Sequence, residues 1–116
     1  MPANSASSLT FEVERDGENA IVHCHGRLVA GVGEWFYPQI RLLIPECKCI
    51  TLDLTDLTHL DSMGIGALVR LYVSARSSGC RFRLINLGPR IQQLLGITHL
   101  LAILTDMCEQ GITLRF

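Results

Sequence analysis

One serine in this chain stands at a position where its hydroxyl could be modified. Ser62 follows Asp61 and comes just before apolar residues spaced at three and four positions, namely Met63, Ile65, Leu68, Val69 and Tyr72. This spacing predicts a helix whose entrance is Ser62, as the N-cap or as the residue beside it. A helix start leaves backbone N–H groups unpaired and carries about half a positive charge. A phosphate on Ser62 would therefore meet amide donors, although the residue could equally serve only as a cap.

The first turn of this helix contains two glycines, Gly64 and Gly66. Because glycine has no side chain, we expect an open surface there that the backbone of another protein can approach. Met63 and Ile65 are expected to be exposed in the same turn as apolar contacts, and methionine is an adaptable one. A nucleotide or another small ligand at residues 62–66 is a further hypothesis, based only on the amide-rich helix start.

Catalysis is not expected from the residues available. Ser62 lacks the G-x-S-x-G turn of a hydrolase, and the four histidines form no convincing triad arrangement with it. We interpret Asp56 as a turn former and Asp61 as an acid that favours the helix dipole, rather than as paired carboxylates. The sequence therefore predicts a protein that is not an enzyme, and no cofactor is expected.

Metal-binding residue types are present but poorly grouped. His23 and His25 alternate along an expected strand and so share a face, but no third ligand accompanies them. The five cysteines are odd in number, and Cys47 and Cys49 form a C-x-C rather than the C-x₂-C pair typical of zinc sites. We therefore expect no metal site and free, mostly buried thiols.

The elements around Ser62 follow from the hydrophobic pattern. Alternating residues predict strands over residues 9–14, 20–25, 49–54 and 80–86, with a further apolar strand over 101–104. Helical spacing predicts helices over 34–44, 63–77 and 88–96. Residues 16–19 read as a hairpin turn, Gly26 is expected to end the second strand, and a polar turn is expected over 55–59. Residues 112–116 could form a strand or coil, and residues 1–8 are expected to be disordered.

These elements indicate one α/β domain. Strands that alternate with helices favour parallel pairing, and the leading hairpin adds an antiparallel pair, so the sheet should be mixed, with four to five strands. A chain of 116 residues of which 48% are hydrophobic is long enough for one core. In the helix over 34–44, Trp35 and Tyr37 are expected to belong mostly to that core.

Composition excludes several classes of partner. Ten basic and eleven acidic residues give a net charge of -1, and no run of Lys or Arg suggests a nucleic-acid partner. No stretch approaches the ~18 apolar residues of a membrane span, so no membrane insertion is expected. The first residues contain no basic residue and no apolar segment of the kind found in secretory signals, so a cytoplasmic location is expected.

The central motif resembles a known family signature. Asp53-Leu54-Thr55, followed by Leu60-Asp61-Ser62-Met63-Gly64-Ile65-Gly66-Ala67-Leu68, is similar to the STAS domain, the anti-sigma factor antagonist family, with its pattern D-L-S-x-x-x-x-x-D-S-S-G-L-G-x-L. The resemblance spans roughly residues 9–105. It implies a single STAS-like domain over residues 9–116, with helices mainly on one face of the sheet. In that family the first serine after the aspartate is phosphorylated, and Ser62 holds that position.

The resemblance also implies a function. Unphosphorylated, the surface over residues 60–66 would bind an anti-sigma factor serine kinase and so free a sigma factor for transcription. Phosphorylation of Ser62 would release the kinase, and a phosphatase would reverse the modification. The partner-binding residues implied are Arg27, Val29, Thr58, His59, Asp61, Met63, Gly64, Ile65 and Gly66.

This chain departs from the family pattern at more than one position, since Met63 stands where the pattern has its second serine. Family members carry G-x-L-D where this chain has Gly26-Arg27-Leu28-Val29, so a carboxylate is missing and the following helix should be weakly capped. An alternative function is a non-switching STAS subunit of a lipid-transport ATPase complex, or a scaffold in a stress-signalling assembly. A weak homodimer is also conceivable, because the apolar tail would suit a self-contact.

Overall fold

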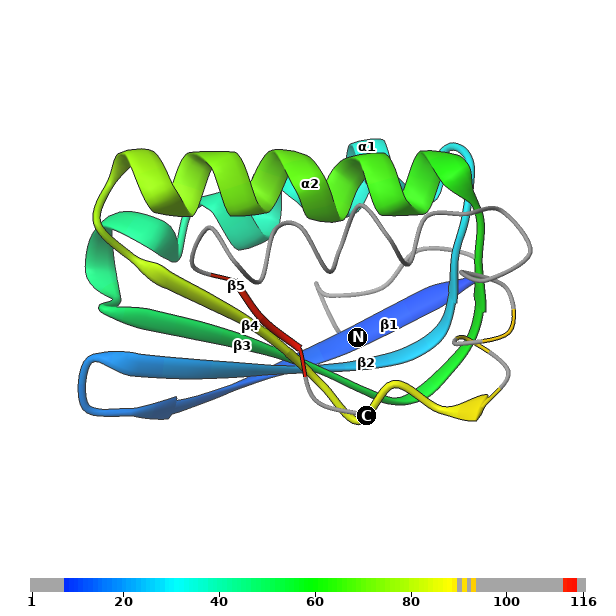
Figure 1. Cartoon of the computed structure of the whole chain (residues 1–116), viewed down its shortest axis with the longest axis horizontal. Coiled ribbons are helices and arrows are strands. Elements are labelled where there is room, and N and C mark those ends of the chain that lie inside the picture. Colours follow the sequence, from blue (N-terminus) through cyan, green and yellow to red (C-terminus); the bar gives the residue numbers. More distant parts are fainter. Residues whose placement is uncertain (1–7, 90, 92, 94–111, 115–116) are drawn as a thin grey trace.

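In the part of the chain that the structure describes, five strands form one mixed sheet, and the helices α1 and α2 cover one of its faces (Figure 1). The computed structural model describes residues 8–89, 91, 93 and 112–114. The order along the chain is β1 (Leu9–Asp16), β2 (Asn19–Leu28), α1 (Val32–Arg41), the 3₁₀ turn η1 (Ile44–Glu46), β3 (Cys49–Leu60), α2 (Ser62–Ser77), β4 (Arg81–Ile85) and β5 (Ile112–Leu114). The predicted mixed sheet with helices mainly on one face is confirmed.

The strand order in the sheet follows the sequence, from β1 at one edge to β5 at the other. β1 and β2 pair antiparallel, with Asp16 opposite Asn19 at the hairpin end, as the turn signal predicts. The remaining neighbours pair in parallel. Because each parallel pair in β2, β3 and β4 is joined through a helix, the carboxyl ends of β2 and β3 and the starts of α1 and α2 meet at one end of the domain.

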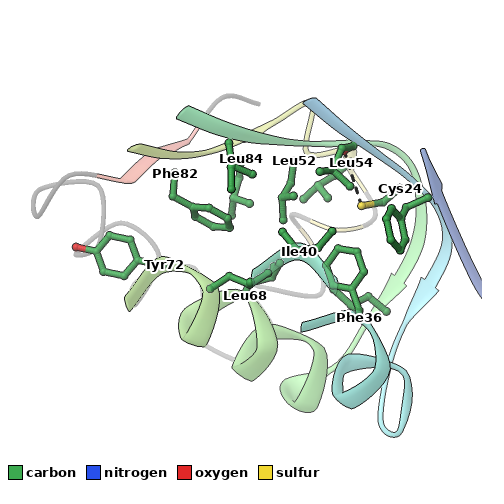
Figure 2. Packing of buried hydrophobic residues seen from close by; sticks show 14 of the residues in the cluster. Cys24, Phe36, Ile40, Leu52, Leu54, Leu68, Tyr72, Phe82 and Leu84 are labelled. Carbon is green, nitrogen blue, oxygen red and sulfur yellow. Dashed lines mark hydrogen bonds between the residues drawn. The ribbon is translucent and has the colours of Figure 1, made fainter. Parts of the chain in front are cut away.

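The core lies between the sheet and the helical layer (Figure 2). Alternate residues of the strands face the helices, among them Cys24, Leu52, Leu54, Phe82 and Leu84, and Phe36, Ile40, Leu68 and Tyr72 meet them from α1 and α2.

The aromatic residues of α1 extend this core to the edge strand. Phe11 of β1 contacts Phe36 edge-on, with ring centroids 5.4 Å apart, and Trp35 at 5.6 Å. Trp35 and Tyr37 are half-buried and pack against the core, as expected.

Two boundaries were predicted wrongly, and both errors have the same cause. β2 continues through Gly26 to Leu28, and the turn expected over residues 55–59 is the second half of β3. The two extensions pair with each other, so that Leu57 and Leu60 stay buried while polar residues alternate on the other side. Pairing supplies hydrogen-bond partners that local turn signals do not reveal.

Gly26 marks a bend in β2 rather than its end. Its φ is +108°, and the register with β3 shifts beside it. A side chain there would collide with the carbonyl of Ser8, which accepts a hydrogen bond from the Arg27 N–H at 2.8 Å.

Other boundaries differ by a few residues. α1 begins two residues earlier than expected and ends at Arg41, with Ile44 in η1. Helical conformation resumes at Pro89, but the rest of the third helix and the strand expected over 101–104 lie outside the described residues. Of the tail, Ile112–Leu114 is a strand paired with β4. Within the described part of the chain, no helix is long and apolar enough to cross a membrane.

Candidate functional site

The start of α2 is built on Asp61, not on Ser62. Asp61 has an extended backbone and is the N-cap, and its Oδ1 accepts a hydrogen bond from the Gly64 N–H at 2.8 Å. Ser62 is the first helical residue, the second of the two positions expected for it. The serine hydroxyl is therefore not used to cap the helix.

The second oxygen of Asp61 reaches another segment. Oδ2 accepts a hydrogen bond from the Ala30 N–H at 2.9 Å, in the loop between β2 and α1. One carboxylate thus caps α2 and fixes the loop beside it. Because both oxygens are engaged within the domain, Asp61 positions the site.

Ser62 and Met63 lie exposed at this end of the domain. Met63 is 56% exposed, which is high for so apolar a side chain. Both residues line a hollow of about 130 Å³ between the first turns of α1 and α2. The rest of its lining comprises Gly31, Gly33, Glu34, Gly66, Ala67 and Arg70.

The predicted exposure of Gly64 and Ile65 is wrong. Ile65 is 3% exposed and belongs to the core. Gly64 is buried, and a Cβ there would collide with the carbonyl of Leu28. At 100° per residue the helix turns these two residues towards the sheet, so they allow α2 to approach β2 closely. Gly66 keeps open space where its Cβ would stand, as expected.

Four further residues predicted to bind a partner lie at the carboxyl ends of β2 and β3. Arg27 and Thr58 are exposed, whereas Val29 and His59 are half-buried. Arg27 of β2 lies opposite His59 of β3 in the register of the two strands. The hydroxyl of Thr58 donates to the Gly26 carbonyl at 3.0 Å. These side chains therefore share the end of the domain at which Ser62 lies.

The start of α1 has no side-chain cap, as expected from Val29, which stands where the family pattern has a carboxylate. The N-cap is Gly31, and no side chain caps this helix. Instead, the carbonyl of Val29 accepts hydrogen bonds from the N–H groups of Val32 and Gly33, at 3.0 and 3.4 Å. The weak capping predicted from the sequence is confirmed.

The open face of the sheet carries a cluster that sequence reasoning missed. His23 is held between Asp53 at 2.9 Å and Glu14 at 3.1 Å. His25 is held between Glu12 at 2.9 Å and Asp56 at 3.0 Å. The sequence does show alternating charged or histidine residues in β1, β2 and β3. Which of them are neighbours depends on the register between these strands, and that register is seen only in the structure.

This cluster shifts two pKa values. Hydrogen bonds that its ring donates to the carboxylates of Glu14 and then Asp53 raise the pKa of His23 above 6.5. Burial alone would raise the pKa of Asp53, but hydrogen bonds from Thr55, Asn86 and His23 outweigh it and lower the pKa to about 2. Both ring nitrogens of each histidine already have carboxylate partners, and no set of three ligands suitable for a metal occurs among the described residues.

The four described cysteines are free thiols, as predicted. Cys24, Cys47 and Cys80 are buried and Cys49 is half-exposed, whereas Cys108 lies outside the described residues. Burial raises the pKa of Cys24 to about 12 and that of Cys80 to about 11. These two thiols are therefore protonated and unreactive at neutral pH.

Most of the chain resembles proteins of known structure. An anti-sigma factor antagonist from Mycobacterium paratuberculosis is similar over 84% of this chain and 83% of its own, with a TM-score of 0.68 and 19% identity. The Bacillus cell fate determinant SpoIIAA in its phosphorylated form is similar over 90% of both chains, with a TM-score of 0.63 and 18% identity. A sulfate transporter family protein from Wolinella succinogenes is similar over 83% of this chain and 76% of its own, with a TM-score of 0.65 and 18% identity.

At these identities the likeness concerns the fold. The model of the STAS domain family, in contrast, matches the sequence itself over residues 10–111. That range contains all of β1 except Leu9, the strands β2 to β4, the helices α1 and α2, and the Asp61–Ser62 helix start. The chain therefore belongs to the STAS domain family.

Proposed function

We propose that this protein is an anti-sigma factor antagonist that binds an anti-sigma factor serine kinase and is switched off by phosphorylation of Ser62. The observation that carries the proposal is the exposed Ser62 hydroxyl at the start of α2, free of any capping role. Binding of the kinase would free a sigma factor in the cytoplasm, and a phosphatase would restore the unmodified protein. The domain would act by binding, without catalysis of its own.

The surface offered to the kinase would consist of Ser62, Met63 and Gly66 around the hollow at the helix start. Met63 supplies an exposed and adaptable apolar contact, and Gly66 allows a close approach. Arg27 and Thr58 lie at the same end of the domain and would form the rim. Asp61 would hold this surface in shape through its two hydrogen bonds.

Phosphorylation would change the interface rather than the fold. A phosphate adds about 1.5 to 2 negative charges, which the N-terminus of a helix tolerates well. The same charge beside Asp61 would have to be desolvated when the kinase covers it, and burying unpaired charge is costly. We therefore expect release of the partner without a large conformational change. The similar SpoIIAA has a structure in a phosphorylated form, which supports the expectation that a domain of this fold stays folded when it is phosphorylated.

The test is to incubate the protein with its cognate kinase and ATP and to measure the intact mass. We expect one phosphoryl group on the wild type and none on Ser62→Ala. In a pull-down, Ser62→Ala should bind the kinase constitutively and Ser62→Asp should lose it. The matched control is Asn19→Asp, which adds one exposed charge at the start of β2, far along the chain from the site. Equal retention of the kinase by the Ser62→Ala and Ser62→Asp variants would contradict the switch.

A second candidate function is a STAS subunit that never switches. It is favoured by the likeness to the sulfate transporter family protein and by Val29, which stands where the family has a carboxylate. Such a subunit would bind a transport ATPase complex or a signalling scaffold permanently. It would then remain in its complex whether residue 62 is serine or aspartate, so the wild type and Ser62→Asp should co-purify with the same partner.

A further inference from the structure

The three large apolar side chains that stand most exposed among the described residues all lie along the seam between α1 and α2. Met63 is 56% exposed at one end of the seam, whereas Leu42 at 72% and Val73 at 54% are exposed at the other. Scattered single apolar residues on a surface need no explanation, but a shared location does.

The seam is hollowed along much of its length. One hollow of about 530 Å³ is lined by Tyr37, Pro38, Arg41, Leu42, Pro45 and Arg70. A second, of about 320 Å³, shares Arg41 and Pro45 with it and continues to Val73 and Ser77 of α2. Arg70 also lines the smaller hollow beside Ser62. The three hollows therefore adjoin one another from the start of α2 to its end.

The distal part of this seam is basic. Its two larger hollows are lined by Arg41 and Arg70 and by no acidic residue. Neither arginine forms an ion pair within the part of the chain that the structure describes. Arg70 stacks on the ring of Tyr37, with its guanidinium carbon 4.1 Å from the ring centroid, and Tyr37 is itself tied to Ser74 by a hydrogen bond of 2.8 Å. One of the two charges is thus held in place at the seam.

We propose that the α1–α2 seam docks an acidic amphipathic helix of a protein partner. Apolar side chains of that helix would pack against Leu42 and Val73, and its carboxylates would meet Arg41 and Arg70. From Met63 to Val73, α2 rises about 15 Å, which corresponds to a partner helix of about three turns. This inference goes beyond the proposed switch, because the distal contacts require no modification of Ser62.

Shape favours a helix over an anionic membrane surface. The seam is hollowed between two helices, a shape that a partner helix can follow along its length, whereas a flat bilayer cannot enter the hollows and would touch only exposed side chains such as Leu42 and Val73. Membrane-binding segments also carry more basic residues than the two found here. When a partner covers the groove, Arg41 and Arg70 lose their hydration. Their charges therefore contribute more to the selection of an acidic partner than to the affinity of binding.

The test uses two labelled helical peptides of about three turns, both with leucine at i, i+3/i+4 and i+7. One carries glutamate and the other lysine at the flanking positions. Fluorescence anisotropy should show that the acidic peptide binds about tenfold more tightly than the basic one. Amide shifts in a ¹⁵N spectrum should map to Arg41, Leu42, Arg70 and Val73. The double variant Arg41→Glu/Arg70→Glu should invert the preference, and Val73→Asp should weaken binding of the acidic peptide.

Arg81→Glu is the matched control, since Arg81 is exposed at the start of β4 and lines none of the three hollows. It should leave the preference unchanged. The proposal is overturned by equal binding of both peptides, by a preference that survives the double variant, or by shifts confined to the sheet face. Binding to phosphatidylglycerol vesicles without binding to the acidic peptide would overturn it too. Because these readouts do not involve Ser62, they fail independently of the phosphorylation assay.

Discussion

Oδ2 of Asp61 and the backbone N–H of Ala30 lie 2.9 Å apart, although 31 positions separate them in the sequence. Through this bond the residue before the candidate phosphorylation site also holds the loop that leads into α1. The other oxygen caps α2. Asp61 therefore fixes both the first turn of α2 and the loop before α1. Ser62 lies on a helix start that these two hydrogen bonds hold in place.

Replacement of Asp61 should reveal both bonds as separate contributions to stability. Asp61→Ala removes the cap and the loop contact, and we expect a loss of about 2 kcal/mol in the free energy of unfolding. Asp61→Asn keeps an oxygen that can cap the helix but cannot accept both hydrogen bonds, so about half that loss is expected. Urea unfolding of the two variants measures the difference.

If Asp61→Asn and Asp61→Ala were equally stable, the helix cap that asparagine retains would contribute nothing, and if Asp61→Asn were as stable as the wild type, the contact with Ala30 would contribute nothing. Ser62→Ala is the control, because the Ser62 hydroxyl does not cap the helix, and it should unfold close to the wild type.

Two glycines in one helical turn should respond in opposite directions to the same substitution. Gly64→Ala places a methyl group against the carbonyl of Leu28, and we expect a loss of about 1–3 kcal/mol or more, because the backbone of β2 would have to move. Gly66→Ala meets open space and should stabilise the helix by about 0.5–1 kcal/mol. Thermal unfolding of both variants, monitored by circular dichroism, provides the comparison. Similar melting temperatures for the two variants would contradict the close approach of α2 to β2.

The negative charge of Asp53 should stabilise the folded protein at neutral pH and lose this effect at strongly acidic pH. Its pKa is lowered to about 2 in the folded protein, against the usual 3.8, so the folded state favours the carboxylate. The contribution is then fully present above pH 3.8 and is lost as the pH falls from there through about 2. The shift corresponds to about 2 kcal/mol. Urea unfolding at pH 6 and at pH 2.5 should show that Asp53→Asn is less stable than the wild type at pH 6 and that the difference falls to about a third of that value at pH 2.5.

Asp16→Asn is the control for this experiment, since Asp16 is an exposed carboxylate at the end of β1. Its difference from the wild type should stay small at both values. A difference for Asp53→Asn that persists unchanged at pH 2.5 would show that Asp53 stabilises the fold by some means other than its charge.

Local patterns were sufficient for much of the fold. Period-two alternation located β1 to β4, helical spacing located α1 and α2, and the alternation of the two types implied parallel pairing. The Asp61–Ser62 helix start was also readable, because a polar pair before an apolar helical stripe is a local signal. Periodicity records which side of an element is apolar, and that information lies within a few residues of sequence.

What the sequence alone determined was therefore the set of elements, the class of fold and the position of Ser62 at a helix entrance. Only the tertiary structure decided which residues of that entrance face solvent. Gly64 and Ile65 turn inward because α2 packs on β2, and residues 55–59 extend β3 because β2 lies beside them. The same holds for the histidine–carboxylate cluster and for the seam that exposes Leu42 and Val73. Such features depend on contacts between residues far apart in the chain, and no local pattern encodes their register.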